Sequence, residues 1–292
     1  MSEISLYSSY DRYAWGGFSV GPRMHRWNNE NIEIPWDKFQ EQNGLRKHYE
    51  ICPYCNSIIT VTNLTDTYIY DEDGDCTIYQ CNECGYWISS INICDFQSSF
   101  TKTAFSVQKR FPIKSKNIPI DELAAFLKNK SHLTKYLHHQ TFEKLTGELL
   151  KVEYGAYEVI HVGKVADRGI DVILIVSENE KILVQCKRRL KDGAVESVST
   201  VKLLLGTLVE HRSLKGIVFS NADYFSYHAI KLTQNANVND AGYEIKLYDK
   251  SVLNLLLDKY PTTPPWDAFF KNELKGTGIA KAHPEESGSH RW

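Results

Sequence analysis

The sequence predicts an α/β protein in which a mixed β-sheet is flanked by helices and preceded by a small β module. Two apolar, β-branched runs between residues 170 and 190 flank the polar residues Glu178-Asn179-Glu180, a pattern typical of a β-hairpin. Helix-like and strand-like patterns then alternate between residues 195 and 259, as expected for helices packed on a sheet. Upstream, two Cys-x-x-Cys pairs adjoin short strand-like runs, which indicates a metal-bound module.

The composition is ordinary for a globular protein, with 42% hydrophobic residues, 24% charged residues and a formal net charge of −2 over 292 residues. A near-neutral chain has no broadly basic coat, so any surface for nucleic acid must be local. The sequence opens without a basic and then apolar segment, and no apolar run approaches the roughly 20 residues that span a bilayer. We expect a cytoplasmic protein without a membrane partner, whose seven cysteines stay reduced.

Residues 1–50 form an aromatic-rich N-terminal segment without a clear period. Gly16-Gly17 and Gly21-Pro22 interrupt any regular element. The aromatic side chains could stack on nucleobases, or they could pack a loop-rich segment onto a neighbouring domain. We favour packing, because that use of aromatic residues is the more common one.

Residues 51–96 carry two Cys-x-x-Cys pairs, formed by Cys52, Cys55, Cys81 and Cys84. Each pair lets two thiolates bind one ion from a tight turn, and two pairs complete a tetrahedron. The alternatives are redox dithiols or unpaired core cysteines. With its strand-like runs at 58–62 and 77–80, the segment resembles a zinc ribbon holding a structural Zn²⁺ ion.

Two further features refine the prediction for this module. Cys76 and Cys94 fall outside the pairs, and we expect them to be small core residues. Acidic residues fill positions 71–73 and 75, where they would repel phosphate. We therefore expect the module to bind a protein partner or brace the fold.

The remaining chain divides into three parts. Residues 97–118 are basic and predict an irregular connector, and lead-in helices follow within the segment 97–134. Residues 135–260 predict the main domain, and residues 261–292 a C-terminal tail whose Trp266, Phe269 and Phe270 can dock back on the core. In the main domain, helices are expected at 141–154, 195–211, 225–236 and 251–259, and strands outside the hairpin at 157–162, 216–220 and 243–247.

The hairpin gathers polar side chains on one face of the predicted sheet. If residues 178–180 form its loop, Ser177 faces Lys181 and Asp171 lies opposite Lys187. Gln185 shares this face because side chains alternate along a strand. A charge on a buried sheet is costly unless it is paired or used, so these residues are candidates for a site. The alternative is a cross-strand ion pair on a solvated face.

A wider pattern surrounds these residues: Phe142-Glu143 on a helix, then Gly169-Ile170-Asp171, then Gln185-Cys186-Lys187. The order and spacing resemble the catalytic domain of Mrr-like restriction endonucleases, a branch of the PD-(D/E)xK nuclease superfamily. The resemblance covers about residues 135 to 258 and implies a restriction-endonuclease-like fold. It implies Mg²⁺ (or Mn²⁺) at the nuclease site and DNA, expected to be double-stranded, as the substrate.

The resemblance also implies roles for individual residues. Asp171 would be the central metal ligand, joined by Glu143, by the amide carbonyl of Gln185 and by the backbone carbonyl of Cys186. Lys187 would orient the attacking water and stabilise charge on the phosphate. The basic residues that follow, Arg188, Arg189 and Lys191, suit phosphate contacts, although they could form a solvated strand edge instead.

The sequence thus predicts a metal-dependent endonuclease that hydrolyses DNA phosphodiester bonds, in a prokaryotic restriction or antiviral-defence setting implied by the resemblance. One alternative is a non-catalytic DNA-binding or scaffold subunit that retains the fold. A second is a nuclease acting on RNA or single strands. A protein partner could bind through the zinc module or the N-terminal segment, and a homo-oligomer is compatible with the sequence.

Overall fold

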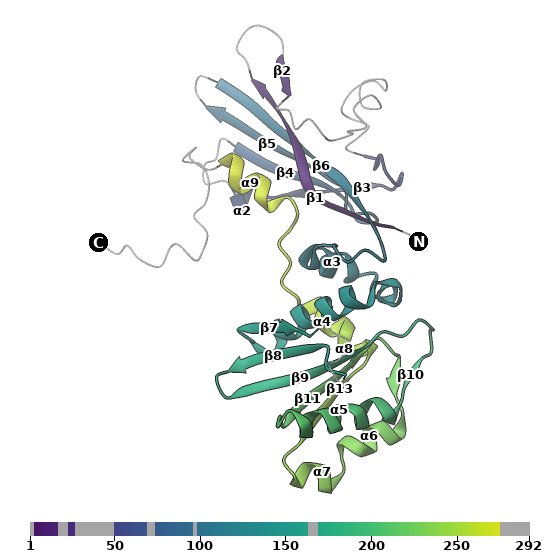
Figure 1. The fold of residues 1–292 in the computed structure, drawn as a ribbon. Coiled ribbons are helices and arrows are strands. Elements are labelled where there is room, and N and C mark those ends of the chain that lie inside the picture. The colour runs from purple at the N-terminus through teal and green to yellow at the C-terminus, as the bar shows by residue number, and fades with distance from the viewer. Residues whose placement is uncertain are drawn as a thin grey trace, which may run out of the picture. The chain divides into compact units, whose positions relative to one another are not determined.

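The computed structural model describes residues 3–16, 23–26, 50–68, 74–95, 98–162 and 169–274 (Figure 1). The chain forms two compact units. The central unit comprises Phe111–Thr262 with the first four residues, and the N-terminal unit comprises Ser5–Arg110 with the chain from Thr263 onward. The N-terminal unit is therefore discontinuous in sequence. Within the described ranges, no helix is long and apolar enough to cross a membrane.

A six-stranded sheet forms the N-terminal unit, in the order β2-β1-β6-β5-β4-β3. Its strands are β1 (Glu3–Gly16), β2 (Arg23–Arg26), β3 (Ile59–Asn63), β4 (Gly74–Cys81), β5 (Trp87–Asp95) and β6 (Ser98–Pro112). Strands β3, β4, β5 and β6 are joined in antiparallel succession, and the short helix α2 (Thr65–Tyr68) lies between β3 and β4. The strands expected beside the cysteine pairs are confirmed as β3 and β4.

Two expectations about this unit are wrong. Residues 98–112 form β6 rather than an irregular connector, and residues 3–16 form β1 rather than a loop-rich segment. The basic residues of this segment led to the prediction of a connector, but a strand with one solvated face tolerates charges on that face. Its middle is buried all the same: Ala104, Phe105 and Ser106 are each at most 6% exposed. The register β5–β6 pairs Ile88 with Phe105.

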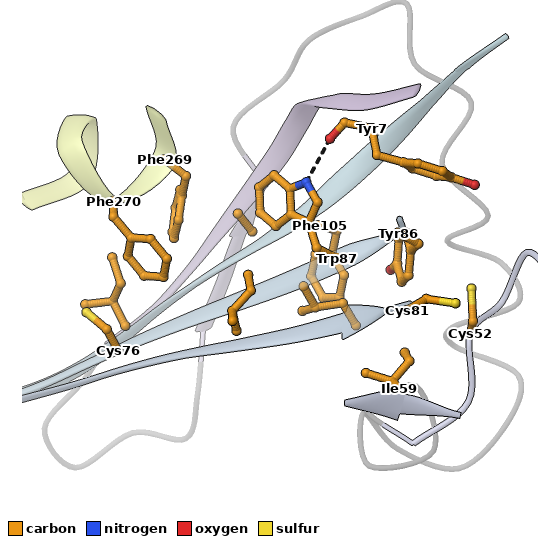
Figure 2. Packing of buried hydrophobic residues seen from close by; sticks show 14 residues of the cluster. Tyr7, Cys52, Ile59, Cys76, Cys81, Tyr86, Trp87, Phe105, Phe269 and Phe270 are labelled. Atoms are coloured by element: carbon orange, nitrogen blue, oxygen red, sulfur yellow. Dashed lines mark hydrogen bonds between the residues drawn. The ribbon is translucent and has the colours of Figure 1, made fainter. Parts of the chain in front are cut away.

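The core of the N-terminal unit gathers aromatic side chains from both ends of the chain (Figure 2). Trp87 is fully buried, and its indole Nε1 donates a hydrogen bond of 2.7 Å to the backbone carbonyl of Tyr7 on β1. Helix α9 (Asp267–Leu274) adds Phe269 and Phe270, both fully buried. Phe270 stacks on Tyr68 at 4.6 Å between ring centroids. The expectation that the C-terminal aromatics dock on a core is confirmed, and that core belongs to the N-terminal sheet.

The central unit contains a five-stranded mixed sheet in the order β13-β11-β9-β8-β7. Its strands are β7 (Glu158–His161), β8 (Val172–Ser177), β9 (Glu180–Lys187), β11 (Lys215–Ser220) and β13 (Glu244–Tyr248). Strands β7, β8 and β9 form an antiparallel meander, whereas β9, β11 and β13 are parallel. The short strands β10 (Val195–Glu196) and β12 (Tyr224–Phe225) pair separately.

Helices cover both faces of this sheet (Figure 1). On one face, α4 (His139–Tyr154) contacts β7, β8 and β9, and α8 (Lys250–Lys259) contacts α4 and β13. On the other, α5 (Val198–Glu210) contacts β9 and β11, and α6 (Tyr227–Thr233) contacts α5 and β13. The remaining helices are α3 (Ile120–Leu127), the 3₁₀ helix η2 (Ser131–Tyr136) and α7 (Ala236–Asp240). The predicted mixed sheet flanked by helices is confirmed.

Two local details differ from the prediction. The helix expected at 225–236 is divided into α6 and α7, because the Asn235 side chain caps a new helix by accepting from the Asn237 amide. The hairpin turn contains only Glu178 and Asn179, and Ser177 pairs with Glu180. Past a bulge, Val172 pairs with Val184, and Asp171, which lies just before β8, donates its amide to the Val184 carbonyl and does not pair with Lys187. The register is thus shifted by two residues, and a shift of two leaves the side chains on their predicted faces.

Candidate active site and metal centre

Helix α4 approaches the sheet closely at a glycine. A Cβ at Gly147 would lie 2.9 Å from Val159 Cγ1 and from His161 Cε1 on β7, so a larger residue would force the helix away. The helix begins at a defined position because the side chain of its N-cap, His138, accepts a hydrogen bond from the Gln140 amide. These two constraints fix Glu143, which lies in the second turn of α4.

Asp171 is tied to β9 by its backbone and by its side chain. Its amide donates to the carbonyl of Val184 at 3.0 Å, although Asp171 itself lies just before β8. Its carboxylate Oδ2 accepts a hydrogen bond of 2.6 Å from the amide of Cys186. A carboxylate held by a backbone N–H at the end of a strand has a fixed orientation, as a metal ligand requires.

The buried thiol of Cys186 shows which charged groups converge here. Burial raises the pKa of Cys186 well above its usual value, and the charges of Asp171 and Glu143 raise it further. Lys187, which is half-buried, has the opposite effect on this pKa. The charges of Glu143, Asp171 and Lys187 therefore act on one buried thiol, although the residues come from α4, from the start of β8 and from the end of β9.

Gln185 is the most unusual polar residue of the site. It is fully buried, and neither its amide oxygen nor its amide nitrogen has a hydrogen-bond partner within the described part of the chain. Its position pairs with Val218, on the face that α5 covers. Gly169 leaves room for the amide: at φ +90°, a Cβ there would lie 2.9 Å from Gln185 Nε2 and 3.1 Å from Leu203 Cδ2.

These residues fit a divalent cation that prefers oxygen ligands. Asp171 contacts β9 at Val184 and Cys186, the residues on either side of Gln185, and its charge and that of Glu143 both act on the Cys186 thiol. Carboxylate and amide oxygens suit Mg²⁺, and a buried amide without a partner is costly unless a ligand completes it. That Glu143, Asp171, Gln185 and the Cys186 carbonyl share one ion stays a prediction.

The basic residues after β9 have different surroundings. Arg189 forms a two-pronged ion pair with Glu196, with Nε to Oε2 at 2.8 Å and Nη2 to Oε1 at 2.5 Å. Arg188 donates from Nη1 to the backbone carbonyl of Lys135 at 2.6 Å. Lys191 is exposed. Sequence reasoning missed Glu196, although an acid at a position that alternates with apolar residues could have pointed to it.

The four paired cysteines form a compact cluster. The sulfurs of Cys52 and Cys84 are 3.5 Å apart and those of Cys55 and Cys81 are 3.4 Å apart, and all four lie within 4.8 Å of one another. A tetrahedron with Zn–S bonds of about 2.3 Å has edges of about 3.8 Å, so the cluster has the dimensions of a four-thiolate site.

The two turns that carry these cysteines are built alike. Each pair is followed by a residue with positive φ, Asn56 at 59° and Gly85 at 88°, and each of these residues donates its amide to the first cysteine carbonyl of its pair at 2.9 Å. Asn and Gly are the residues that tolerate this conformation best. The predicted turn is therefore present twice, with Asn56 taking the part that Gly85 takes in the second turn.

Hydrogen bonds surround the sulfurs. A hydrogen bond with Cys52 lowers the pKa of Cys84 to about 5, and the Tyr7 hydroxyl and the Tyr86 amide act in the same direction. Gln108 Nε2 donates to the Tyr7 hydroxyl at 3.0 Å, so β1 and β6 both support the cluster. Among the described residues, Cys76 is not part of the group, and the Cys94 side chain lies outside the described atoms.

Comparison with known proteins places one part of the chain. Residues 134–257 match the family model Mrr_cat, described as a restriction endonuclease. No curated protein matches the sequence. A solved structure titled "Structure of EndoMS in apo form" aligns with 85% of this chain and 88% of that chain at 8% identity and a TM-score of 0.23. A score this low supports no inference about fold or activity.

Proposed function

We propose that the protein is a metal-dependent endonuclease that hydrolyses DNA phosphodiester bonds, and the proposal proceeds from the match of residues 134–257 to the restriction endonuclease model Mrr_cat. The observation that carries the proposal is the convergence of Glu143, Asp171 and Lys187 around Cys186. A non-catalytic scaffold would have no use for two acids and an ammonium gathered from a helix and two strands. It would also gain nothing from the unpartnered buried amide of Gln185, the residue before Cys186 on β9.

Each residue has a role that its position supports. Asp171 and Glu143 would hold the ion, and Mg²⁺ (or Mn²⁺), when bound, neutralises charge on the scissile phosphate and acidifies a water. The Gln185 carbonyl would add a neutral ligand, so we expect weaker metal affinity than a third acid would give, and a single ion. Lys187 Nζ would orient the attacking water and donate to the phosphate oxygen that gains charge.

The DNA contacts that we propose lie beyond the end of β9. Lys191 is exposed and Arg188 is half-buried, and both follow Lys187 within four residues. Phosphate contacts from such residues would fix the duplex over the site without reading its sequence. Arg189 is engaged by Glu196, so it supports this role less well than Lys191 does.

For the cysteine cluster we propose one structural Zn²⁺ ion bound by Cys52, Cys55, Cys81 and Cys84. The sulfur separations and the amide donors around the sulfurs support this assignment. Four thiolates on two tight turns leave no open coordination position for catalysis. The ion would hold the start of β3 against the end of β4, which explains how a sheet edge with few apolar residues stays ordered.

The biological setting belongs to the proposal as well. We propose action on double-stranded DNA in the cytoplasm, in prokaryotic restriction or antiviral defence. A protein partner could bind the N-terminal unit, and a homo-oligomer would place two nuclease sites on one duplex.

The test is a plasmid-cleavage assay with Mg²⁺ or Mn²⁺ on the wild type, Asp171→Ala and Lys187→Ala, with DNA affinity measured by gel shift. Loss of the Lys187 ammonium should remove at least about 3 kcal/mol of transition-state stabilisation, a hundredfold in rate, with little loss of affinity. Lys151→Ala, at the other end of α4, controls for the loss of one charge.

The outcomes separate the alternatives. A wild type that binds DNA but cleaves nothing would support the scaffold reading and overturn ours. Cleavage of RNA or single strands only would support the second alternative, a nuclease that does not act on double-stranded DNA. Full cleavage by Lys187→Ala would show that the active site lies elsewhere.

A further inference from the structure

The carboxylate of Glu196 is fully buried and yet surrounded by donors. Besides both prongs of Arg189, its Oε1 accepts a hydrogen bond of 2.6 Å from the Thr200 hydroxyl, and its Oε2 lies 3.2 Å from Ser220 Oγ. Burial by itself would raise the pKa of Glu196, but the hydrogen bonds from Arg189 and Thr200 lower it overall, so the group is ionised at neutral pH. Such a group needs all of its partners in place.

This network reaches the strand end that carries Lys187. Ser220 pairs with Lys187 in the β9–β11 ladder, and Ser220 Oγ lies 3.0 Å from the Lys187 carbonyl oxygen. One hydroxyl therefore contacts both the Glu196 carboxylate and the backbone of Lys187. Ser220 is itself fully buried, so water cannot substitute for it readily.

A second set of hydrogen bonds, from Asn221, fixes the backbone of Arg189. The side chain of Asn221 accepts from the Arg189 amide at 2.5 Å and donates to the Arg189 carbonyl at 3.0 Å. The amide of Asn221 also approaches the Lys187 carbonyl at 3.4 Å. Both ends of the segment from Lys187 to Arg189 are therefore held, by Ser220 at the end of β11 and by Asn221 directly after it.

We propose that Glu196 and Arg189 are positioning residues, which hold the end of β9 so that the Lys187 ammonium is aimed at the reacting phosphate. Arg189 would then be an internal anchor and not a phosphate contact. This inference rests on the proposed nuclease function. A displacement of about 1 Å at a catalytic group can cost a hundredfold in rate, so a rigid strand end has catalytic value beyond stability.

The variants separate positioning from folding. Single removal of either charge leaves its partner buried alone, which destabilises the fold, whereas Arg189→Met with Glu196→Gln removes both charges together. The Gln side chain can still accept from Thr200 and donate toward Ser220. We expect this double variant to melt near the wild type but to cleave about ten- to a hundredfold more slowly at saturating DNA.

DNA binding gives an independent readout. If Arg189 is an anchor, the double variant keeps the affinity of the wild type and the slope of log affinity against log salt. Lys191→Ala should behave differently: it should bind more weakly, and its salt slope should fall by about one. Ser220→Ala removes a single hydroxyl and tests the connection directly, with an expected loss of cleavage rate of about fivefold or more at unchanged affinity.

The inference is overturned if the double variant and Ser220→Ala both cleave at the wild-type rate at saturating DNA. It is also overturned if the double variant flattens the salt slope as Lys191→Ala does, since Arg189 would then contact phosphate. A double variant too unstable to assay leaves Ser220→Ala to decide. Failure of the proposed function is a separate result, because the wild type itself would then not cleave DNA.

Discussion

Replacing Gln185 with methionine should stabilise the central unit in the absence of metal and abolish cleavage. Gln185 is fully buried with both amide atoms unpartnered among the described residues, and a buried polar group without a partner costs about 1–3 kcal/mol. Methionine keeps the length and volume of the side chain without polar atoms. We therefore expect the free energy of unfolding in EDTA to rise by about 1–3 kcal/mol, or about 2–4 °C in Tm for each kcal/mol.

The assay is thermal and urea unfolding, with EDTA and with a series of Mg²⁺ concentrations. A ligand that binds only the folded state stabilises it by about 2.7 kcal/mol at a hundred times its Kd. The wild type should gain this stability with Mg²⁺, and Gln185→Met should gain less because it lacks the carbonyl. Gln185→Glu is the matched control, and both effects should be reversed. A buried acid should lower the free energy of unfolding in EDTA and increase the stabilisation that Mg²⁺ gives.

The reasoning fails if Gln185→Met is less stable than the wild type in EDTA, because the amide would then have partners that stabilise the fold. It also fails if Gln185→Met cleaves DNA at the wild-type rate. In that case Gln185 would fill space under α5, and the metal would be held without it.

Two further predictions concern the N-terminal unit. The purified protein should contain about one zinc per chain, and Cys52→Ser with Cys81→Ser should lose it; elemental analysis that finds no zinc in protein kept reduced would contradict the assignment. Phe270→Ala should destabilise the N-terminal unit by about 3–5 kcal/mol in urea unfolding, because Phe270 is fully buried and stacks on Tyr68. Val61→Ala, at a position of β3 that is 60% exposed, serves as the control in the same unit, and equal effects of the two changes would show that α9 does not pack as described.

The hairpin shows why a sequence can place side chains despite a wrong turn. The predicted three-residue loop is a two-residue turn, and the β8–β9 register beyond the bulge is shifted by two residues, with Val172 opposite Val184. Side chains alternate with a period of two, so this shift leaves each residue on its face. A shift of one would have moved every polar side chain of the hairpin to the opposite face.

Other features depend on contacts that no local pattern records. Arg189 has the sequence context of a phosphate contact, and only the fold places it against Glu196, which Ser220 also contacts. The same limit applies to Gln185. Alternation gives its face, but its lack of partners follows from the packing of Gly169 and α5 around it.

The sequence by itself determined the order of helices and strands in the central unit, the two cysteine turns and the set of motif residues. Each of these features follows from short-range periodicity or from the spacing of a few residue types. The tertiary structure decided that β1 and β6 extend the N-terminal sheet and that α9 completes its core. Long-range packing determines which element pairs with a sheet edge or covers an aromatic face. The physical reason is that any complementary element can bury apolar surface, so the local sequence does not specify which one does.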